Sequence, residues 1–229
     1  NLVATDQMVD SPTNNFCTWN PLTKRGEDGY DATLAEGNLK GTTSSKWNGT
    51  GSTFLLPESG KWYAEFEVTG APSELAFGIV DPSLMYTETK PYDNPIPCAI
   101  YRCDGLLLYT GGNSTSTDIN TFANGDIIGI AVDMDADEFW LAKNNTWQGA
   151  SSPNPSTGTS GHDLSTAAGV NYTFAFLTGG SSSNETGTAN FGQDSSFAGV
   201  KTAQGNQDAN EVGDFYYAPP TDFLALCTS

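Results

Sequence analysis

Alternation of apolar and polar residues over short runs is the feature that most constrains this fold. In residues 61–70, KWYAEFEVTG, the side chains of Trp62, Ala64, Phe66 and Val68 share one face of a strand. The other face carries the intervening residues Lys61, Tyr63, Glu65 and Glu67. Because such period-two runs are typical of strands with one buried face, we expect this second face to be exposed to solvent.

Further runs of the same type recur along the chain, separated by residues typical of turns. Within residues 98–112 the pair Asp104–Gly105 marks a hairpin. The other short runs lie at 74–81, 124–135, 138–144, 171–180 and 187–193. No run has the apolar spacing of a convincing amphipathic helix. The pattern therefore predicts an all-β fold in which two antiparallel sheets pack as a β-sandwich.

A polar stretch at residues 149–163, GASSPNPSTGTSGHD, has no strand pattern. The segments on both sides of it share one composition, so we interpret it as a surface loop and not as a linker between domains. Residues 1–229 are accordingly expected to form one module. The chain begins NLVATD, with neither Met nor a signal-peptide pattern, which suggests a processed product or an excerpt of a longer protein.

The charge balance narrows the classes of partner. Nine Lys and Arg residues stand against 27 Asp and Glu residues, which gives a formal net charge of −18. Such a surface repels phosphate backbones and anionic headgroups, so nucleic-acid binding is not expected. Membrane insertion is not expected either, because no run approaches the roughly 18 apolar residues of a spanning helix.

The cysteines and the histidine exclude the usual zinc sites. The four cysteines are Cys17, Cys98, Cys103 and Cys227, without a CxxC pair, and His162 is the sole histidine. We expect buried free thiols. A disulfide between Cys17 and Cys227 remains an alternative if the two terminal segments pair. The sequence predicts no metal centre and no cofactor.

Three alternating aspartates, Asp133, Asp135 and Asp137, raise the question of a calcium loop. A calcium-binding loop of the EF-hand type has glycine at its sixth position and glutamate at its twelfth, where this chain has Glu138 and Asn144. The hairpin interpretation fits better, with a turn at residues 135–137 and the first two aspartates on the solvent face. A weak calcium contact remains the alternative.

No catalytic constellation stands out. Glu65 and Glu67 come nearest to a paired carboxylate, but a solvated strand face explains them better. Ser160 and His162 lie in a Gly/Ser-rich loop without the context of a nucleophile elbow. We therefore expect a protein that is not an enzyme.

The order of motifs along the chain resembles a known family. In succession the chain carries SPTNNFCTWNPL, SGKWYAEFEV, FGIVDPS, FANGDIIGIAVDMDADEFWLAKNN and FYYAPPTDFLALCTS. From about Asp10 to Ser229 these resemble the SPRY-like, concanavalin A-type sandwich modules of virion structural proteins from marine tailed bacteriophages. The hairpin is similar to the SPRY signature G-D-x-I-G-V-x-x-D…F-x-K-N-G. Asn145 stands where that signature has its last glycine, and Asn also tolerates the left-handed backbone that the turn needs.

The resemblance implies a SPRY-type, jelly-roll sandwich whose N- and C-terminal segments pair and whose loops bind a partner without catalysis. It also implies a place on the virion surface after assembly in the host cytoplasm, in contact with other virion proteins of the capsid or tail. Virion fibres are often homotrimers, but nothing in the sequence encodes a trimer.

Loop aromatics beside amide and carboxylate groups are the candidate ligand-binding residues, because sugars bind to such combinations. They are Tyr86, Tyr92, Asp93, Asn145, Trp147, Tyr216 and Tyr217. For Trp147 a hydrophobic cap over the hairpin end is an equal alternative. For Tyr216 and Tyr217 the equal alternative is packing on the sandwich.

The leading functional hypothesis is a tail-fibre, spike or head-fibre module that contacts host-surface carbohydrate. A capsid decoration protein with a purely structural role is the second hypothesis. A glycan-cleaving enzyme is the third, and it requires a matched carboxylate pair in a cleft.

Overall fold

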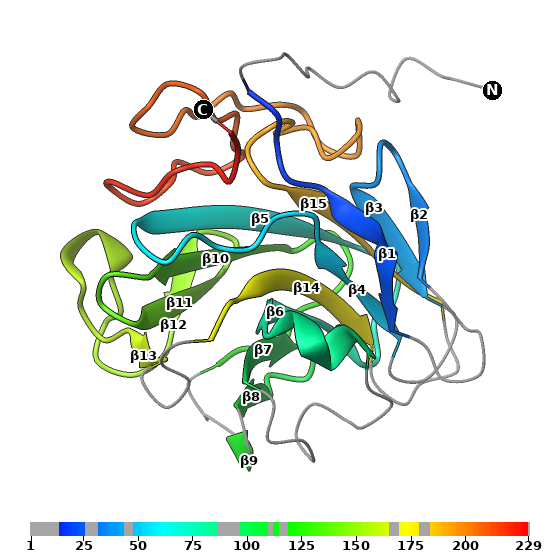
Figure 1. Ribbon diagram of the computed structural model, residues 1–229, viewed down its shortest axis with the longest axis horizontal. Helices are drawn as coiled ribbons and strands as arrows, with labels where there is room; N and C mark the ends of the chain where they lie inside the picture. Colours follow the sequence, from blue (N-terminus) through cyan, green and yellow to red (C-terminus); the bar gives the residue numbers. More distant parts are fainter. Residues whose placement is uncertain are drawn as a thin grey trace.

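A computed structural model describes residues 14–25, 32–43, 48–86, 97–109, 112–114, 119–164, 170–178 and 184–228. These residues build two antiparallel sheets that pack face to face, as the alternation predicts (Figure 1). In spatial order the first sheet contains β1 (Trp19–Arg25), β4 (Gly49–Ser52), β14 (Thr173–Thr178), β6 (Leu75–Val80), β7 (Cys98–Arg102), β8 (Leu107–Tyr109) and β9 (Gly112–Ser114). The second contains β12 (Thr146–Gln148), β11 (Glu138–Lys143), β10 (Ile127–Asp133), β5 (Lys61–Thr69), β15 (Glu185–Asn190), β3 (Lys40–Thr43) and β2 (Thr33–Ala35), and β13 (His162–Asp163) pairs with β11.

The all-β prediction is confirmed. The helices among the described residues are the short 3₁₀ segments η3 (Pro82–Tyr86) and η5 (Pro155–Thr157). Within the same residues, no helix is long and apolar enough to cross a membrane.

Aromatic rings fill the space between the two sheets. Phe66 of β5 stacks on Phe77 with ring centroids 4.9 Å apart, and on Trp19 at 5.7 Å. Phe191 meets the Trp19 ring edge-on at 5.2 Å, and Phe174 lies 6.0 Å from Phe66. All five side chains are fully buried, so the inward face of 61–69 is the core face that the alternation predicts.

The outward face of β5 is not solvated, which corrects the sequence prediction. Tyr63, Glu65 and Glu67 are all buried. Residues 206–227, here called the terminal strap, fold back over this face, and Figure 1 shows them on the side of β5 and β15 away from β14 and β6. Strand alternation reports which residues share a face, but a third layer can bury both faces.

Two apolar rings anchor the strap. Phe215 lies 5.1 Å from Tyr63, and Phe223 meets Trp140 edge-on at 6.2 Å. Leu224 forms a parallel bridge with Trp62, exchanging backbone hydrogen bonds with its neighbours Lys61 and Tyr63. The strap therefore adds a layer to the sheet both by packing and by backbone pairing.

Residues 15–17 pair with residues 226–228 at the edge of this layer. Phe16 and Cys227 form an antiparallel bridge, with backbone hydrogen bonds from Cys17 to Leu226 and from Thr228 to Asn15. All four cysteines are free thiols, and Cys17, Cys98 and Cys103 are buried as expected while Cys227 is half-buried.

The aspartate hairpin has the predicted turn, with β10 ending at Asp133 and β11 beginning at Glu138. Asp133, however, is only 4% exposed, against the solvent-facing position predicted for it. Its carboxylate pairs with Lys61 at 3.0 Å and accepts hydrogen bonds from the backbone N–H groups of Asp135 and Ala136. Asp133 is thus a structural residue of the turn.

The next turn, between β11 and β12, has the backbone that its sequence predicts. Asn144 and Asn145 both have positive φ, 47° and 61°. The Asn144 side chain also accepts a hydrogen bond from Ile127 N at 2.9 Å, which ties the turn to the start of β10. The substitution of Asn for the usual glycine therefore preserves the hairpin.

The polar stretch 149–163 is more ordered than predicted. It contains η5 and β13, and Asn154 forms a bridge with Thr159. Trp140 explains the order, because its indole N–H donates to Thr159 O and its ring packs against Gly161. The stretch therefore packs over the side chain of Trp140, a role that its composition does not reveal.

Replacement of Phe66 by alanine is expected to lower the free energy of unfolding by about 3–5 kcal/mol, because the ring touches four other core aromatics. Chemical denaturation measures the change. The control is Leu22→Ala at a side chain that is 84% exposed, for which we expect a change within about 0.5 kcal/mol. Equal effects of the two substitutions would contradict the assigned core.

Candidate functional site

Glu65, in the middle of β5, is the polar centre of the strap-covered face. Its side chain is fully buried, and four donors surround its carboxylate. Oε1 accepts from the Tyr63 hydroxyl at 3.1 Å and from Tyr217 N at 2.8 Å. Oε2 accepts from Tyr216 N at 2.8 Å and from the Asn190 side chain at 3.3 Å. One carboxylate therefore fixes two consecutive backbone N–H groups of the strap.

Burial raises the pKa of Glu65 to about 7, and the hydrogen bonds from Tyr217, Tyr216, Tyr63 and Asn190 oppose that rise. The four donors match an ionised carboxylate, which is an acceptor only. Near neutral pH the cost of burying the ionised carboxylate and the stabilisation from its four hydrogen-bond donors are thus closely balanced.

A second buried carboxylate fixes the path of the strap. Asp208 Oδ1 accepts from the N–H groups of Val212 and Gly213, both at 3.0 Å, and Oδ2 accepts from Ala225 N at 2.8 Å. Asp208 is 7% exposed. It therefore joins the two limbs of the strap on either side of Tyr216 and Tyr217.

The rings of Tyr216 and Tyr217 form a fixed pair at the surface. Their centroids are 5.0 Å apart with the planes at 85°, and both side chains are half-buried. Phe197, fully buried, supports Tyr216 at 6.1 Å. Phe197 and Ala198 both have left-handed backbones, with φ of 51° and 56°. Such strain in non-glycine residues persists where the surrounding structure holds it, often at functional sites.

Trp147 belongs to the same face. Its half-buried ring lies 6.4 Å from Tyr63, edge to face, on the strand next to Ala142. The Tyr63 ring fits because Gly129 has no side chain: a Cβ there would lie 2.9 Å from the Tyr63 hydroxyl oxygen. Trp147 therefore flanks Tyr63, whose hydroxyl also shares Glu65 with the Tyr217 N–H group. We call Trp147, Tyr216 and Tyr217 the aromatic face.

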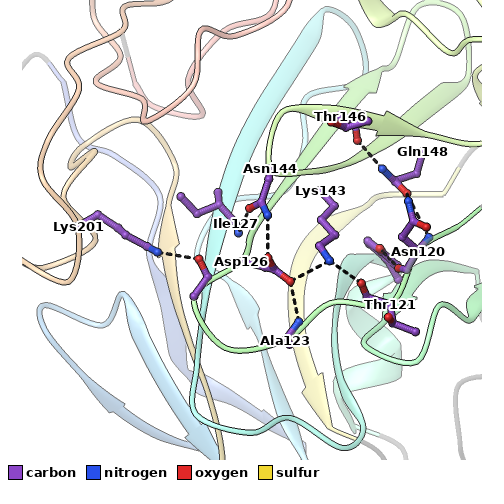
Figure 2. Close-up of polar contacts among 12 residues, drawn as sticks. Asn120, Thr121, Ala123, Asp126, Ile127, Lys143, Asn144, Thr146, Gln148 and Lys201 are labelled. Atoms are coloured by element: carbon purple, nitrogen blue, oxygen red, sulfur yellow. Dashed lines mark hydrogen bonds and ion pairs between the residues drawn. The ribbon is translucent and has the colours of Figure 1, made fainter.

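A polar network lies at the start of β10 (Figure 2). Lys143 donates to Thr121 O at 2.8 Å and pairs with Asp126 at 3.1 Å, and Asn144 donates to the same carboxylate at 2.7 Å. Although burial alone would raise it, the pKa of Asp126 is lowered by the hydrogen bonds from Ala123 N, Asn144 and Lys143. The network holds residues 121–126 against the β11–β12 turn.

Two other contacts extend the same network in Figure 2. Lys201 donates to Gly125 O at 2.7 Å, which ties the strained segment after β15 to this loop. Gln148 accepts hydrogen bonds from the Asn120 backbone at 3.1 Å and from its side chain at 2.8 Å. Both lysines of the network are therefore engaged by other groups of the protein.

The structure brings together part of the predicted ligand-binding set. Trp147, Tyr216 and Tyr217 lie on one face, and Asn145 is exposed in the adjacent turn. Tyr86 ends η3, which contacts β1 and β4 of the other sheet, and its side chain is not described. Tyr92 and Asp93 lie outside the described residues.

The alternatives weighed for the aromatics are both partly correct. Trp147 does pack on the hairpin, and the strap of Tyr216 and Tyr217 does pack on the sandwich, yet each ring keeps part of its surface exposed. Sequence reasoning missed Tyr63 and Glu65 as their support. The signal for it was available: the apolar residues of DFYYAPPTDFLAL need a partner surface, and the outward face of 61–67 offers an aromatic ring and a carboxylate.

The other side chains considered as candidate site residues, Glu67 and His162, make contacts that stabilise the fold. Glu67 accepts from the Thr69 hydroxyl at 2.7 Å, and burial raises its pKa. Burial lowers the pKa of His162, whose ring lies 5.1 Å from Phe139. In the described part of the chain, no three His, Cys, Asp or Glu side chains are grouped as metal ligands would be.

Comparison with known proteins gives a fold and no closer relative. No family model matches, and no curated protein matches. The SPRY domain of human HERC1 superposes with a TM-score of 0.58 at 16% identity, over 75% of this chain and 96% of that one. The chain has a SPRY-like fold.

Other solved structures agree with that assignment. The TRIM65 PSpry domain matches 76% of the chain and 90% of its own length, with a TM-score of 0.52 and 12% identity. Stonustoxin has a TM-score of 0.51 at 18% identity, and the match spans 76% of this chain but 27% of that protein. At these identities the likeness establishes the SPRY-like sandwich alone.

The pKa of Glu65 predicts a pH-dependent stability. Because the folded value of about 7 exceeds the ordinary 4.5, folding favours the protonated form, and this contribution is lost as pH rises from about 4.5 to 7. The Glu65→Gln variant lacks this loss. We expect the free energy of unfolding of the native protein, relative to that of the variant, to fall by up to about 3 kcal/mol across that range. Denaturation of both proteins at several pH values measures it, and parallel pH profiles would contradict the buried carboxylate.

Proposed function

We propose that this chain is a non-catalytic recognition module on a virion surface, and that its aromatic face contacts carbohydrate of the host surface. The observation that carries the proposal is the preorganised Tyr216–Tyr217 pair, fixed through its backbone by Glu65 and supported by strained Phe197. A binding surface that is already rigid loses little conformational entropy when the ligand arrives.

The composition of the face suits a sugar. Half-buried aromatic rings offer flat apolar surfaces to the C–H groups of a pyranose, and an exposed amide beside them offers hydrogen-bond partners to its hydroxyls. Asn145, exposed beside Trp147, supplies such an amide. The proposal therefore rests on shape and chemistry together.

The buried position of Glu65 supports a role in binding over one in glycan cleavage. A glycosidase needs two carboxylates that reach the scissile bond. Both oxygens of Glu65 are occupied by internal donors, and Glu67 is 2% exposed. The absence of enzymatic activity remains a prediction.

The virion context of the proposal rests on the family resemblance of the motifs. On that proposal the protein is assembled in the host cytoplasm and contacts other capsid or tail proteins, as a homotrimer where it belongs to a fibre. The SPRY-like fold is compatible with this setting but is shared with the unrelated settings of the proteins that it matches.

A capsid decoration role is the second candidate. The formal net charge of −18 favours it, because an acidic protein would bind a basic patch on a capsid lattice. The number of copies per particle separates the two roles. Hundreds of copies spread over the capsid would favour decoration, and a few at a fibre or tail tip would favour host recognition.

Binding to an array of oligosaccharides from bacterial surfaces tests the carbohydrate role. We expect Trp147→Ala and Tyr217→Ala each to weaken binding about tenfold or more, because each removes a stacking surface. The control is Leu55→Ala, which truncates a 47% exposed apolar side chain outside the aromatic face and should leave binding unchanged. Thermal unfolding confirms that the variants are folded. Unchanged binding by folded Trp147→Ala and Tyr217→Ala proteins would remove this face from the proposal.

A further inference from the structure

A buried polar cluster lies at one end of the space between the two sheets, on the face of the second sheet opposite to the strap. Its centre is Glu185, the first residue of β15, whose side chain is 1% exposed. We infer that the Glu185 carboxylate and the Thr43 hydroxyl bind a monovalent alkali cation, Na⁺ or K⁺, inside the sandwich. Such an ion stabilises the fold, and its binding is independent of the proposed recognition role.

The direction of the Glu185 side chain follows from the other residues on its face of β15. A Cβ added at Gly187 would lie 2.5 Å from the Phe77 ring, and Ala189 belongs to the inter-sheet core. Because side chains alternate along a strand, Glu185 also points between the sheets. A carboxylate therefore lies inside the sandwich, at the end where β15 begins.

Thr43, the last residue of β3, faces the same space. The antiparallel ladder pairs it directly with Glu185, and Figure 1 shows β3 and β15 side by side. Two residues earlier on β3, a Cβ added at Gly41 would lie 3.1 Å from the Phe176 ring, so this face of β3 is the inward one. Directly paired residues have Cβ atoms roughly 4.5–5.5 Å apart, so the hydroxyl and the carboxylate are neighbours.

Each of these two groups has an oxygen without a hydrogen-bond partner. Glu185 Oε1 accepts from Ser73 N at 3.1 Å, from the Ser73 hydroxyl at 2.8 Å and from Glu74 N at 2.8 Å. Glu185 Oε2 and Thr43 Oγ1 are buried, and neither has a hydrogen-bond partner among the described residues. Although they are neighbours, the hydroxyl does not donate to the carboxylate, so both oxygens are available to a third atom. Buried polar groups are rarely left unpaired, and an ion or a water is the usual partner of those that the protein does not satisfy.

The charge of the pair favours a monovalent cation over a divalent one and over water. Among the described residues, no ion pair joins Glu185 to a Lys or Arg side chain. One alkali cation neutralises the carboxylate, whereas Ca²⁺ would leave a net positive charge in the interior, where an uncompensated charge is costly. The described residues also lack a group of three acidic, His or Cys side chains that would suit a divalent metal. Carboxylate and hydroxyl oxygens are the hard ligands that alkali cations accept.

The opposite sheet offers a further oxygen at the same end. Phe176 of β14 lies in the inter-sheet core, so alternation also turns Thr178 inward, and Thr178 is 3% exposed. Thr178 pairs with Leu75, which directly follows the backbone N–H groups that bind Glu185. A hydroxyl of the first sheet therefore lies near the carboxylate of the second.

Thermal unfolding of the native protein in different chloride salts tests the site without any substitution. NaCl and KCl are each compared with choline chloride at one ionic strength, since the choline cation is too large for a buried site. In at least one of the two alkali salts we expect an unfolding midpoint about 3–5 °C above that in choline chloride, because a ligand that binds the folded state alone stabilises it. Equal midpoints in the three salts would overturn the cation site and leave a bound water as the partner of the two oxygens. Stabilisation by CaCl₂ alone would overturn the monovalent assignment.

Substitutions assign the effect to the two residues. Glu185→Gln removes the charge at nearly the same volume, and we expect its midpoint to be equal in the three salts. Thr43→Ser keeps the hydroxyl and should keep the difference between salts, whereas Thr43→Val should lose most of it. The control is Glu58→Gln, which removes a charge from an exposed residue in the loop before β5 and should show the native difference. A native-sized difference between salts in folded Glu185→Gln protein would contradict the assigned site.

Discussion

The buried carboxylate of Glu65 is the interaction on which the unusual part of this structure depends. A SPRY-like sandwich needs only its inter-sheet core of stacked aromatics to form two layers. The terminal strap adds a third layer, and it does so over a strand that carries a glutamate in its centre. That charge can be buried because two tyrosine N–H groups of the strap, a tyrosine hydroxyl and an asparagine amide all donate to it. Each therefore makes the other possible: the strap covers the carboxylate, and the carboxylate orders the strap.

This mutual dependence has a consequence for the surface. The Glu65 carboxylate fixes the backbone N–H groups of Tyr216 and Tyr217, and both rings stay half-buried above this base. Trp147 reaches the same face from a different hairpin, through Tyr63. Three half-buried rings from segments about 70 residues apart in sequence thus converge, as recognition surfaces on rigid scaffolds commonly do.

Much of the sandwich is predictable from local pattern. The runs at 61–70, 74–81, 124–135 and 138–144 each contain a strand, and the inward residues expected for 61–70 lie in the core. The Asn144–Asn145 turn has the left-handed backbone that its residues favour. Strands such as β3 and β4 are missing from the prediction because Gly and Thr dominate them, and pairing with neighbours, not their own pattern, makes them strands.

The parts that sequence reasoning misplaced share one physical cause. Glu65, Glu67 and Asp133 were assigned to solvent because charged residues alternate with apolar ones, but all three are buried. Glu65 is bonded to the distant strap, and Asp133 is paired with Lys61 of another strand. Alternation contains no information about a third layer, and Glu65 lies 151 residues from the first of its strap donors. The candidate aromatics Trp147, Tyr216 and Tyr217 were named individually, but their convergence through Tyr63 requires the tertiary structure.

The most direct test of the Glu65 carboxylate is an NMR measurement on the backbone amides of Tyr216 and Tyr217. Because both amides donate to the buried carboxylate, we expect slow hydrogen exchange for both and chemical shifts that titrate together near neutral pH, following the raised pKa of Glu65. In Glu65→Gln the shared titration should disappear while the core amides of β5 and β10 stay protected. Rapid exchange of the two amides in the native protein, or shifts that ignore the protonation of Glu65, would contradict the account.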